Sequence, residues 1–124
     1  MKNVVKTDKA PGAIGPYSQG IQIGDMFFFS GQIPLNPADG TMPEGIVEQA
    51  KQSLTNVKGL LESQGLTFSN VVKTTVFLDN IDDFATVNEV YAQFFTEPFP
   101  ARSAVEVGRL PKGALIEVEV IAVK

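Results

Sequence analysis

The fold is decided by the stretch Ala114-Leu115-Ile116-Glu117-Val118-Glu119-Val120-Ile121-Ala122-Val123, close to the end of the chain. Successive side chains of a β-strand point to opposite faces, so one face of this strand is uniformly apolar: Ala114, Ile116, Val118, Val120 and Ala122. The opposite face mixes aliphatic side chains with two carboxylates: Leu115, Glu117, Glu119, Ile121 and Val123. We expect the first face to lie under helices. The second is too apolar for open solvent and is typical of a sheet face that packs on another chain.

Two segments with helical spacing of apolar residues precede this strand. The first is predicted from about Glu44 to Gln64, ahead of the stop signal Gly65; its apolar positions are Ile46, Val47, Ala50, Leu54, Val57, Leu60 and Leu61. The second is predicted from near Ile81 to about Phe95, with Asn80 or Asp82 as its cap. Its buried stripe is expected to contain Phe84, Val87, Asn88, Tyr91 and Phe95.

Further strands are predicted from apolar and β-branched runs. These are Asn3 to Thr7, Gln19 to Ile23, Met26 to Gln32, Val71 to Leu78 and Ala101 to Arg109. Gly24-Asp25 is expected to form a tight turn, and Leu110-Pro111-Lys112-Gly113 is expected to join the last two strands. The order predicts one α+β domain, residues 1–124, in which both helices cover one face of a single mixed β-sheet.

Composition narrows the possible functions. The 124 residues include 44% hydrophobic residues and carry a formal net charge of −4, with no run of basic residues, which argues against binding to nucleic acid or to an anionic membrane. The chain has no cysteine and no histidine, so disulfides, thiolate chemistry, common zinc sites and the usual general base are excluded. No signal-peptide or membrane-spanning stretch is seen, and a cytoplasmic protein is the simplest expectation.

Arg102 is the strongest candidate for a functional side chain. It lies in Phe99-Pro100-Ala101-Arg102-Ser103-Ala104-Val105, where a permanent cation enters an apolar strand and requires an anionic partner. Alternation predicts that Val105 and Val107 face the helices and that Arg102 and Glu106 share the face of Glu117 and Glu119. A symmetrical hairpin would place Arg102 opposite roughly residue 121, about 13 Å along the strand from Glu117.

That spacing predicts that Arg102 and Glu117 do not meet within one chain, so a compact site that uses both would need two subunits. From the residues alone, a structural ion pair with Glu117 or Glu119 across a subunit contact ranks at least equal to catalysis.

Several segments in the same order resemble the RidA/YjgF family of imine and enamine deaminases. They are Gly15-Pro16-Tyr17-Ser18-Gln19, Phe29-Ser30-Gly31-Gln32-Ile33-Pro34, Val72-Lys73-Thr74-Thr75-Val76-Phe77, Phe99-Pro100-Ala101-Arg102-Ser103 and Ile116-Glu117-Val118-Glu119. The resemblance implies a chorismate-mutase-like α+β fold that assembles as a homotrimer, with sheets lining a central barrel and pockets between neighbouring subunits. It also implies a reaction without cofactor or metal: hydrolysis of 2-imino acids, such as 2-iminobutanoate and 2-iminopropanoate, to 2-oxo acids and ammonia. That reaction would protect pyridoxal-phosphate enzymes.

The resemblance assigns roles to particular residues. Arg102 would bind the substrate carboxylate, and Glu117 would position or activate the attacking water. The other substrate-binding positions would be Tyr17, Ser30, Gly31, Asn88 and the backbone N–H of Ala104, where many members carry cysteine. Glu119 shares the face of Glu117, and only the resemblance chooses between them. The connection from Thr96 to Pro100 is shorter than in some relatives, so the resemblance does not determine the pocket rim or the substrate range.

Simpler structural interpretations exist for the same positions. Tyr17 is also compatible with a packed loop aromatic, Ser30 and Gly31 with a β-bulge, and Asn88 with a structural hydrogen bond to a loop. Two alternative functions are a non-enzymatic sensor or regulator that binds small carboxylates, and a ribonuclease or translation inhibitor. The acidic charge and the absence of histidine disfavour the ribonuclease.

Overall fold

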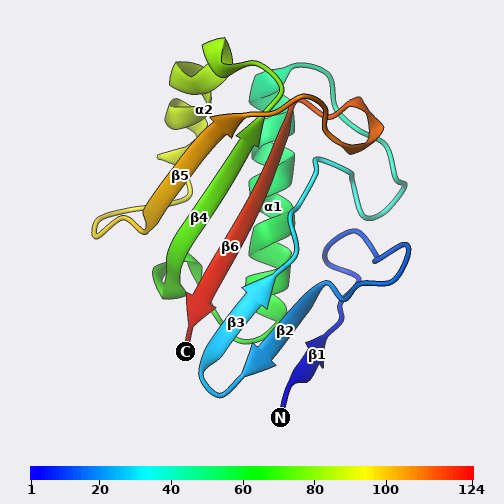
Figure 1. The fold of residues 1–124 in the computed structure, drawn as a ribbon, viewed down its shortest axis with the longest axis vertical. Coiled ribbons are helices and arrows are strands. Elements are labelled where there is room, and N and C mark those ends of the chain that lie inside the picture. The colour runs from blue at the N-terminus through cyan, green and yellow to red at the C-terminus, as the bar shows by residue number, and fades with distance from the viewer.

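Six strands form one mixed sheet in the computed structural model, which describes residues 1–124 (Figure 1). The strands are β1 (Asn3–Val5), β2 (Gly20–Ile23), β3 (Met26–Phe29), β4 (Val71–Leu78), β5 (Ala101–Glu106) and β6 (Ile116–Val123). Their order across the sheet is β1-β2-β3-β6-β4-β5, and only β4 and β5 run parallel. The predicted α+β class with a mixed sheet is therefore confirmed.

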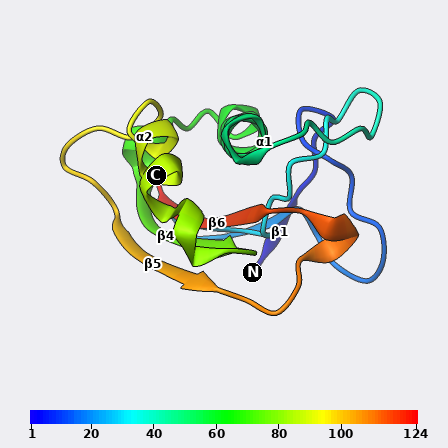
Figure 2. The same cartoon turned by 90° about the horizontal axis from the view of Figure 1, so that it is seen from above.

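Both helices cover the same face of the sheet (Figure 2). The first, α1 (Ile46–Ser63), ends where Gly65 takes a left-handed φ of 72° and its N–H donates to the carbonyl of Glu62. The second, α2 (Phe84–Tyr91), is shorter than predicted because the short 3₁₀ helix η2 (Ile81–Asp83) forms its first turn and irregular turns follow it. The predicted cap is confirmed, since Asn80 Oδ1 accepts from the Asp82 N–H at 2.9 Å. Neither helix has the length and apolar character that a membrane crossing requires.

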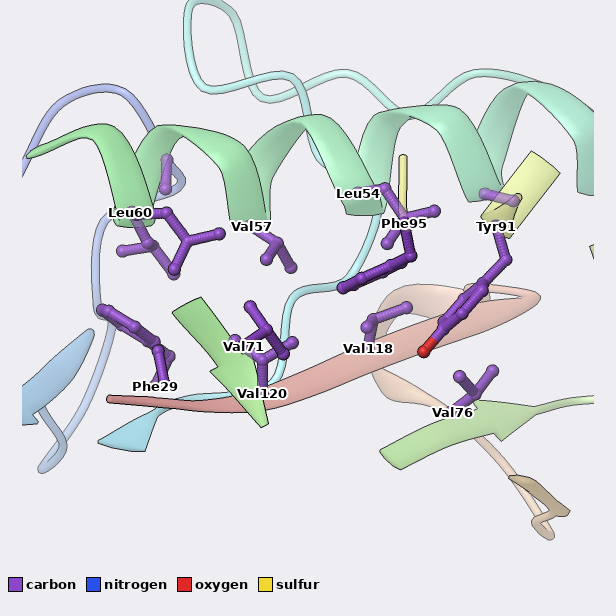
Figure 3. Close-up of a cluster of buried hydrophobic side chains, with 14 of the residues drawn as sticks. Phe29, Leu54, Val57, Leu60, Val71, Val76, Tyr91, Phe95, Val118 and Val120 are labelled. Atoms are coloured by element: carbon purple, nitrogen blue, oxygen red, sulfur yellow. The ribbon is translucent and has the colours of Figure 1, made fainter. Parts of the chain in front are cut away.

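The core lies between the helices and the sheet (Figure 3). The predicted inner face of β6 is confirmed, because its apolar members are all buried: Ala114, Ile116, Val118, Val120 and Ala122. All of these except Ala114 pack with Leu54, Val57 and Leu60 of α1 and with Tyr91 of α2 in one hydrophobic cluster. Burying an aliphatic side chain contributes roughly 1.5–3 kcal/mol, so this cluster holds the helices on the sheet.

The predicted hairpin between the last two strands is wrong. The strand β4 lies between β5 and β6, and residues 107–115 pass over the end of β4 rather than turning back beside β5. Parallel pairing of β4 and β5 requires a crossover, which η2 and α2 provide. A Pro-Lys-Gly turn fits either connection, so local turn chemistry did not distinguish them.

The predicted face of β5 is also wrong. Arg102 lies opposite Thr74, which is fully buried under α2, so Arg102 and Ala104 point to the helix face of the sheet. Val105 points to the other face, where it is 44% exposed. Alternation showed which residues share a face but not which face is the core, and the open face of this sheet is itself apolar.

Candidate functional site

All of the predicted site residues except Ala104 lie in two separate pockets. The first, a cavity of about 520 Å³ that we name the glutamate pocket, contains Tyr17, Ser30, Gly31 and Glu117. Its other lining residues are Pro11, Gly12, Ile14, Gln19, Gln32, Ile33, Leu35, Pro111 and Lys112. The second, a cavity of about 410 Å³ that we name the arginine pocket, is lined by Asn88, Tyr91, Ala92, Phe99, Pro100 and Arg102. Ala104 lines neither pocket.

The glutamate pocket forms where β3 leaves the sheet. The backbone N–H of Ser30 donates to the carbonyl of Gln19, and its hydroxyl donates to the carbonyl of Ser18 at 2.6 Å. The chain rejoins the ladder at Gln32, which pairs with Val118 of β6. Between these anchors, Gly31 passes directly against Glu117, and a Cβ at position 31 would overlap the Glu117 carboxylate. The strand predicted from Met26 to Gln32 therefore ends at Phe29, and the break after it places Gly31 against the catalytic candidate.

Glu117 is a half-buried carboxyl group inside this pocket. Burial raises its pKa above the ordinary value, and the negative charge of the neighbouring Glu119 raises it further. A raised pKa brings a carboxyl group closer to neutrality, where it can both accept and return a proton. Glu119 is exposed and does not line the pocket, so the geometry separates the two carboxylates that alternation left equivalent.

Tyr17 lies in the loop before β2 and is 53% exposed, so it is not a packed aromatic. The loop is fastened by Gln19, whose side chain bonds to the backbone of Thr7, Ala10 and Pro11. Because the amide of Gln19 is buried and hydrogen-bonded through both its oxygen and its nitrogen, the loop holds a defined position at the pocket wall. Its tyrosine ring is thereby presented to the cavity that contains Glu117.

Two lining residues were missed by the sequence reasoning. Pro111 and Lys112 were predicted only as a turn, but both line the glutamate pocket. Lys112 is the one non-glycine residue with positive φ, at 57°. The Pro-Lys-Gly sequence signalled a turn, but the place of that turn at the glutamate pocket depends on the path of residues 107–115 over β4.

The arginine pocket is built by α2 and β5. One terminal nitrogen of Arg102, Nη1, donates to Asn88 Oδ1 at 2.8 Å. The guanidinium carbon lies 4.8 Å from the centre of the Tyr91 ring and 5.2 Å from that of Phe84. Phe84 and Tyr91 were predicted as core residues, and their contact with Arg102 could not be anticipated while β5 was assigned to the other face.

No carboxylate of the chain pairs with Arg102. The one ion pair is Lys51 with Glu48, at 3.6 Å on the surface of α1. Within one chain Arg102 forms no ion pair with Glu117 or Glu119, and the ion pair across a subunit contact stays a prediction. The guanidinium stays exposed and keeps donors for an external anion.

The two pockets open on opposite faces of the sheet. Arg102 lies on the helix face at the level of Thr74 and Val120, whereas Glu117 lies on the open face opposite Phe77. The prediction that the two side chains do not meet within one chain is confirmed, although the cause is the opposite faces and not a hairpin register. Ala104 lies on β5, the edge strand, whose outer backbone groups face no neighbouring strand of this chain.

The arrangement can support two different kinds of chemistry. The glutamate pocket offers a proton acceptor beside apolar walls, and the arginine pocket offers a fixed cation for a small anion. No group of three or more acidic side chains lies close enough to hold a metal ion.

Comparisons with known proteins identify a family model and relatives that match nearly the full length of the chain. The family model described as Endoribonuclease L-PSP matches residues 7–124. The 2-iminobutanoate/2-iminopropanoate deaminase of Escherichia coli K12 is 54% identical over 127 residues, covering 100% of this chain and 99% of that protein.

Solved structures show the same fold. The YjgF gene product of E. coli superimposes with a TM-score of 0.94 at 54% identity, covering 98% of each chain. E. coli TdcF with bound serine has a TM-score of 0.94 at 49% identity and also covers 98% of each chain.

Proposed function

This chain belongs to the RidA/YjgF family, which the L-PSP model describes, and from that premise we propose that it hydrolyses 2-imino acids to 2-oxo acids and ammonia. The substrates would include 2-iminobutanoate and 2-iminopropanoate, as in the name of the E. coli relative that matches the full chain. The observation that carries the proposal is the complementary pair of pockets: one holds an unpaired cation, and the other holds a carboxyl group with a raised pKa.

Arg102 binds the carboxylate of the substrate. A guanidinium offers parallel N–H donors that match the two oxygens of a carboxylate, and charge assistance strengthens these bonds. Arg102 meets this requirement because only one of its nitrogens is used, by Asn88. The bound serine named for E. coli TdcF is also a small molecule with a carboxylate, which supports a ligand of this class.

Glu117 handles the protons of the reaction. The oxygen of a water molecule bonds to the imine carbon, one of its protons passes to Glu117, and the π-electrons of the C=N bond move to nitrogen. Glu117 returns the proton to that nitrogen, which gives a carbinolamine. The new hydroxyl then passes its proton through Glu117 to the nitrogen, and the C–N bond breaks as the C=O bond forms, which releases ammonia and leaves a 2-oxo acid. The raised pKa of Glu117 suits both transfers, and Tyr17, Ser30 and Gly31 shape the cavity around it.

A complete site requires two copies of the chain. The glutamate pocket of one subunit would face the arginine pocket of its neighbour, in a homotrimer whose sheets line a central barrel. Exposed apolar residues on the open face support this assembly: Met26 is 41% exposed, Phe28 40% and Val105 44%. The edge position of β5 would also let the Ala104 backbone reach a ligand held between subunits.

The proposed role is interception of reactive imines before they damage pyridoxal-phosphate enzymes. Those enzymes would be the sources of the substrate, and the cytoplasm is the compartment we propose for this protein. Glu117, Arg102 and the backbone suffice for the hydrolysis, and the proposed reaction uses no cofactor.

The test generates 2-iminobutanoate with a threonine dehydratase and follows its disappearance with and without this protein. Wild-type protein is expected to accelerate the loss, and Arg102→Ala to return it to the background rate. Arg109→Ala is the matched control, because Arg109 is exposed and lines neither pocket. Light scattering verifies that all three proteins have the same oligomeric state.

A carboxylate-binding regulator is the second candidate, because the arginine pocket alone can hold a small anion. Binding of 2-oxobutanoate to wild-type protein without acceleration of imine loss would favour the regulator over the enzyme. Cleavage of RNA that persists in Arg102→Ala would indicate a contaminating nuclease, whereas the net charge of −4 gives RNA little electrostatic attraction.

A further inference from the structure

The side chain of Arg102 is supported by one stripe of α2. Phe84, Asn88 and Tyr91 follow each other at intervals of four and three residues, so they project from the same side of the helix. The guanidinium carbon lies over both aromatic rings, at 4.8 Å from Tyr91 and 5.2 Å from Phe84. Both distances are within the roughly 6 Å at which a ring attracts a cation.

The Tyr91 ring is itself fixed. Its hydroxyl lies 2.8 Å from Oγ1 of Thr74, and both side chains are buried. The ring also stacks on Phe95, with centroids 4.3 Å apart. Thr74 is also the residue directly opposite Arg102 in the β4–β5 ladder, so the ring and the arginine backbone are held by the same position of β4.

Asn88 completes the support with a neutral acceptor. Its Oδ1 takes one N–H of Nη1 and leaves the other donors of the guanidinium available. A carboxylate at this position would neutralise the cation and compete with an anionic ligand. An amide orients the side chain without doing so.

From this geometry we propose that Tyr91, Phe84 and Asn88 are positioning residues that hold Arg102 ready for a carboxylate before it arrives, and that Asn88 acts on Arg102 and not on the substrate. The inference rests on the proposed function for the identity of the ligand. An exposed arginine otherwise samples many rotamers, and ordering it in advance reduces the entropy lost on binding.

The first test uses ligand-free protein. The chain has two arginines, so ¹⁵N-arginine labelling gives side-chain NMR signals from Arg102 and from exposed Arg109, which serves as an internal control. In wild-type protein the Arg102 signals are expected to be shifted by the aromatic rings and to show slow guanidinium rotation. Tyr91→Leu should move them toward those of Arg109, whereas Tyr91→Phe, which keeps the ring, should retain most of the shift.

The half-buried Phe84 and Asn88 provide variants that do not disturb the centre of the core. Phe84→Leu is expected to reduce the Arg102 shift, and Asn88→Ala to speed the rotation of its guanidinium. Arg102 signals that stay the same as wild type in Tyr91→Leu, Phe84→Leu and Asn88→Ala would overturn the proposal. This result needs no turnover, so it is independent of whether the protein is a deaminase.

The second test separates binding from chemistry. With 2-iminobutanoate, Asn88→Ala is expected to raise KM about 3- to 10-fold and Asn88→Asp about 10-fold or more, while kcat stays within about twofold. If wild-type protein shows no turnover, the Kd of 2-oxobutanoate replaces KM, which distinguishes failure of the proposed function from failure of this inference. A wild-type KM or Kd in Asn88→Asp would contradict the positioning role.

Discussion

The glutamate pocket and the arginine pocket differ in how the chain builds them. The first is assembled from loops far apart in sequence, around residues 11–35 and 111–117. The second comes from α2 and the strand that follows it, with a helical stripe beneath one side chain of β5. A proton-transfer group gains from loops that exclude water and raise its pKa, whereas an anion-binding group gains from a rigid frame. The difference shows how one small fold carries two unlike pockets on opposite faces of its sheet.

The strongest test of whether the two pockets work together is to inactivate each pocket in a different chain. Arg102→Ala and Glu117→Gln are each expected to lower kcat/KM by about 10²- to 10³-fold. If each site takes its arginine from one subunit and its glutamate from the next, random mixed oligomers restore both groups in about one quarter of the sites. Co-refolding the two variants in equal amounts and assaying imine hydrolysis measures this recovery.

The matched control mixes two preparations of the same variant, Arg102→Ala with itself, which should recover nothing. Activity of the mixed oligomers that equals the sum of the two inactive proteins would contradict the shared site.

Gly31→Ala tests how closely the glutamate pocket is built around its carboxyl group. The added Cβ would overlap the Glu117 carboxylate and displace it, and a misplacement of about 1 Å costs up to 10²-fold in rate. We expect kcat to fall about 10- to 100-fold with the fold retained. Gly12→Ala is the control, because Gly12 lines the same pocket but a Cβ there meets no atom within 4 Å. Equal kcat values for the two variants would show that the position of Glu117 does not set the rate of imine hydrolysis.

Asn56→Ala tests whether the core of α1 holds the loop wall of the glutamate pocket. The Asn56 side chain donates to the carbonyls of Ile33 and Leu35, both of which line that pocket. Leaving two carbonyls without donors should cost about 1–3 kcal/mol of unfolding free energy, measured by urea denaturation, and should lower activity.

Ser53→Ala is its control on the same helix. The Ser53 hydroxyl is buried without a hydrogen-bond partner, so its removal should leave stability unchanged or slightly higher. A loss in Ser53→Ala as large as that in Asn56→Ala would mean that the helix surface, and not the bonds to the loop, sets the stability.

The smallest expected effect concerns the cost of holding Glu117 in its pocket. Its pKa is raised in the folded state, so the folded protein binds more protons than the unfolded chain, and stability falls as pH rises from the ordinary glutamate pKa of 4.5 through the raised value. Glu117→Gln removes this penalty and should raise Tm by about 1–3 °C at neutral pH, since the group is only half-buried and solvent screens it. The gain should disappear as pH falls below 4.5. A Tm difference that does not change with pH would exclude the ionisation of Glu117 as its cause.

Local patterns predicted much of this fold. The range of β4, the two helices, the Asn80 cap and both faces of β6 follow from periodicity and capping chemistry, because those signals depend on neighbours in sequence. The partner of β5 could not be predicted in this way. A Pro-Lys-Gly turn closes a hairpin or passes over a strand equally well, and only the packing of α2 against the sheet selects the parallel pairing.

The candidate site also combines features that the sequence predicts with features that only the tertiary structure decides. The sequence proposed Arg102, Glu117, Tyr17, Ser30, Gly31 and Asn88 as candidates, mainly through the family resemblance. It also predicted that Arg102 and Glu117 do not meet within one chain, although the hairpin register behind that prediction was wrong. Their grouping into two pockets, the ring support of Arg102 and the position of Lys112 were decided by the tertiary structure.

The physical reason for this division is that a β-strand has two faces, and alternation treats them equally. The sequence by itself determined which residues alternate and which chemical groups the protein possesses, because these are local properties of the chain. Alternation, however, does not show which face of a strand the helices cover. Because both faces of this sheet carry apolar residues, alternation left the core side of β5 undecided. The face of Glu117 was already predicted, because the opposite face of β6 is uniformly apolar. Only the tertiary structure decided that Arg102 lies beneath α2, because that choice depends on which face of β5 the helices cover.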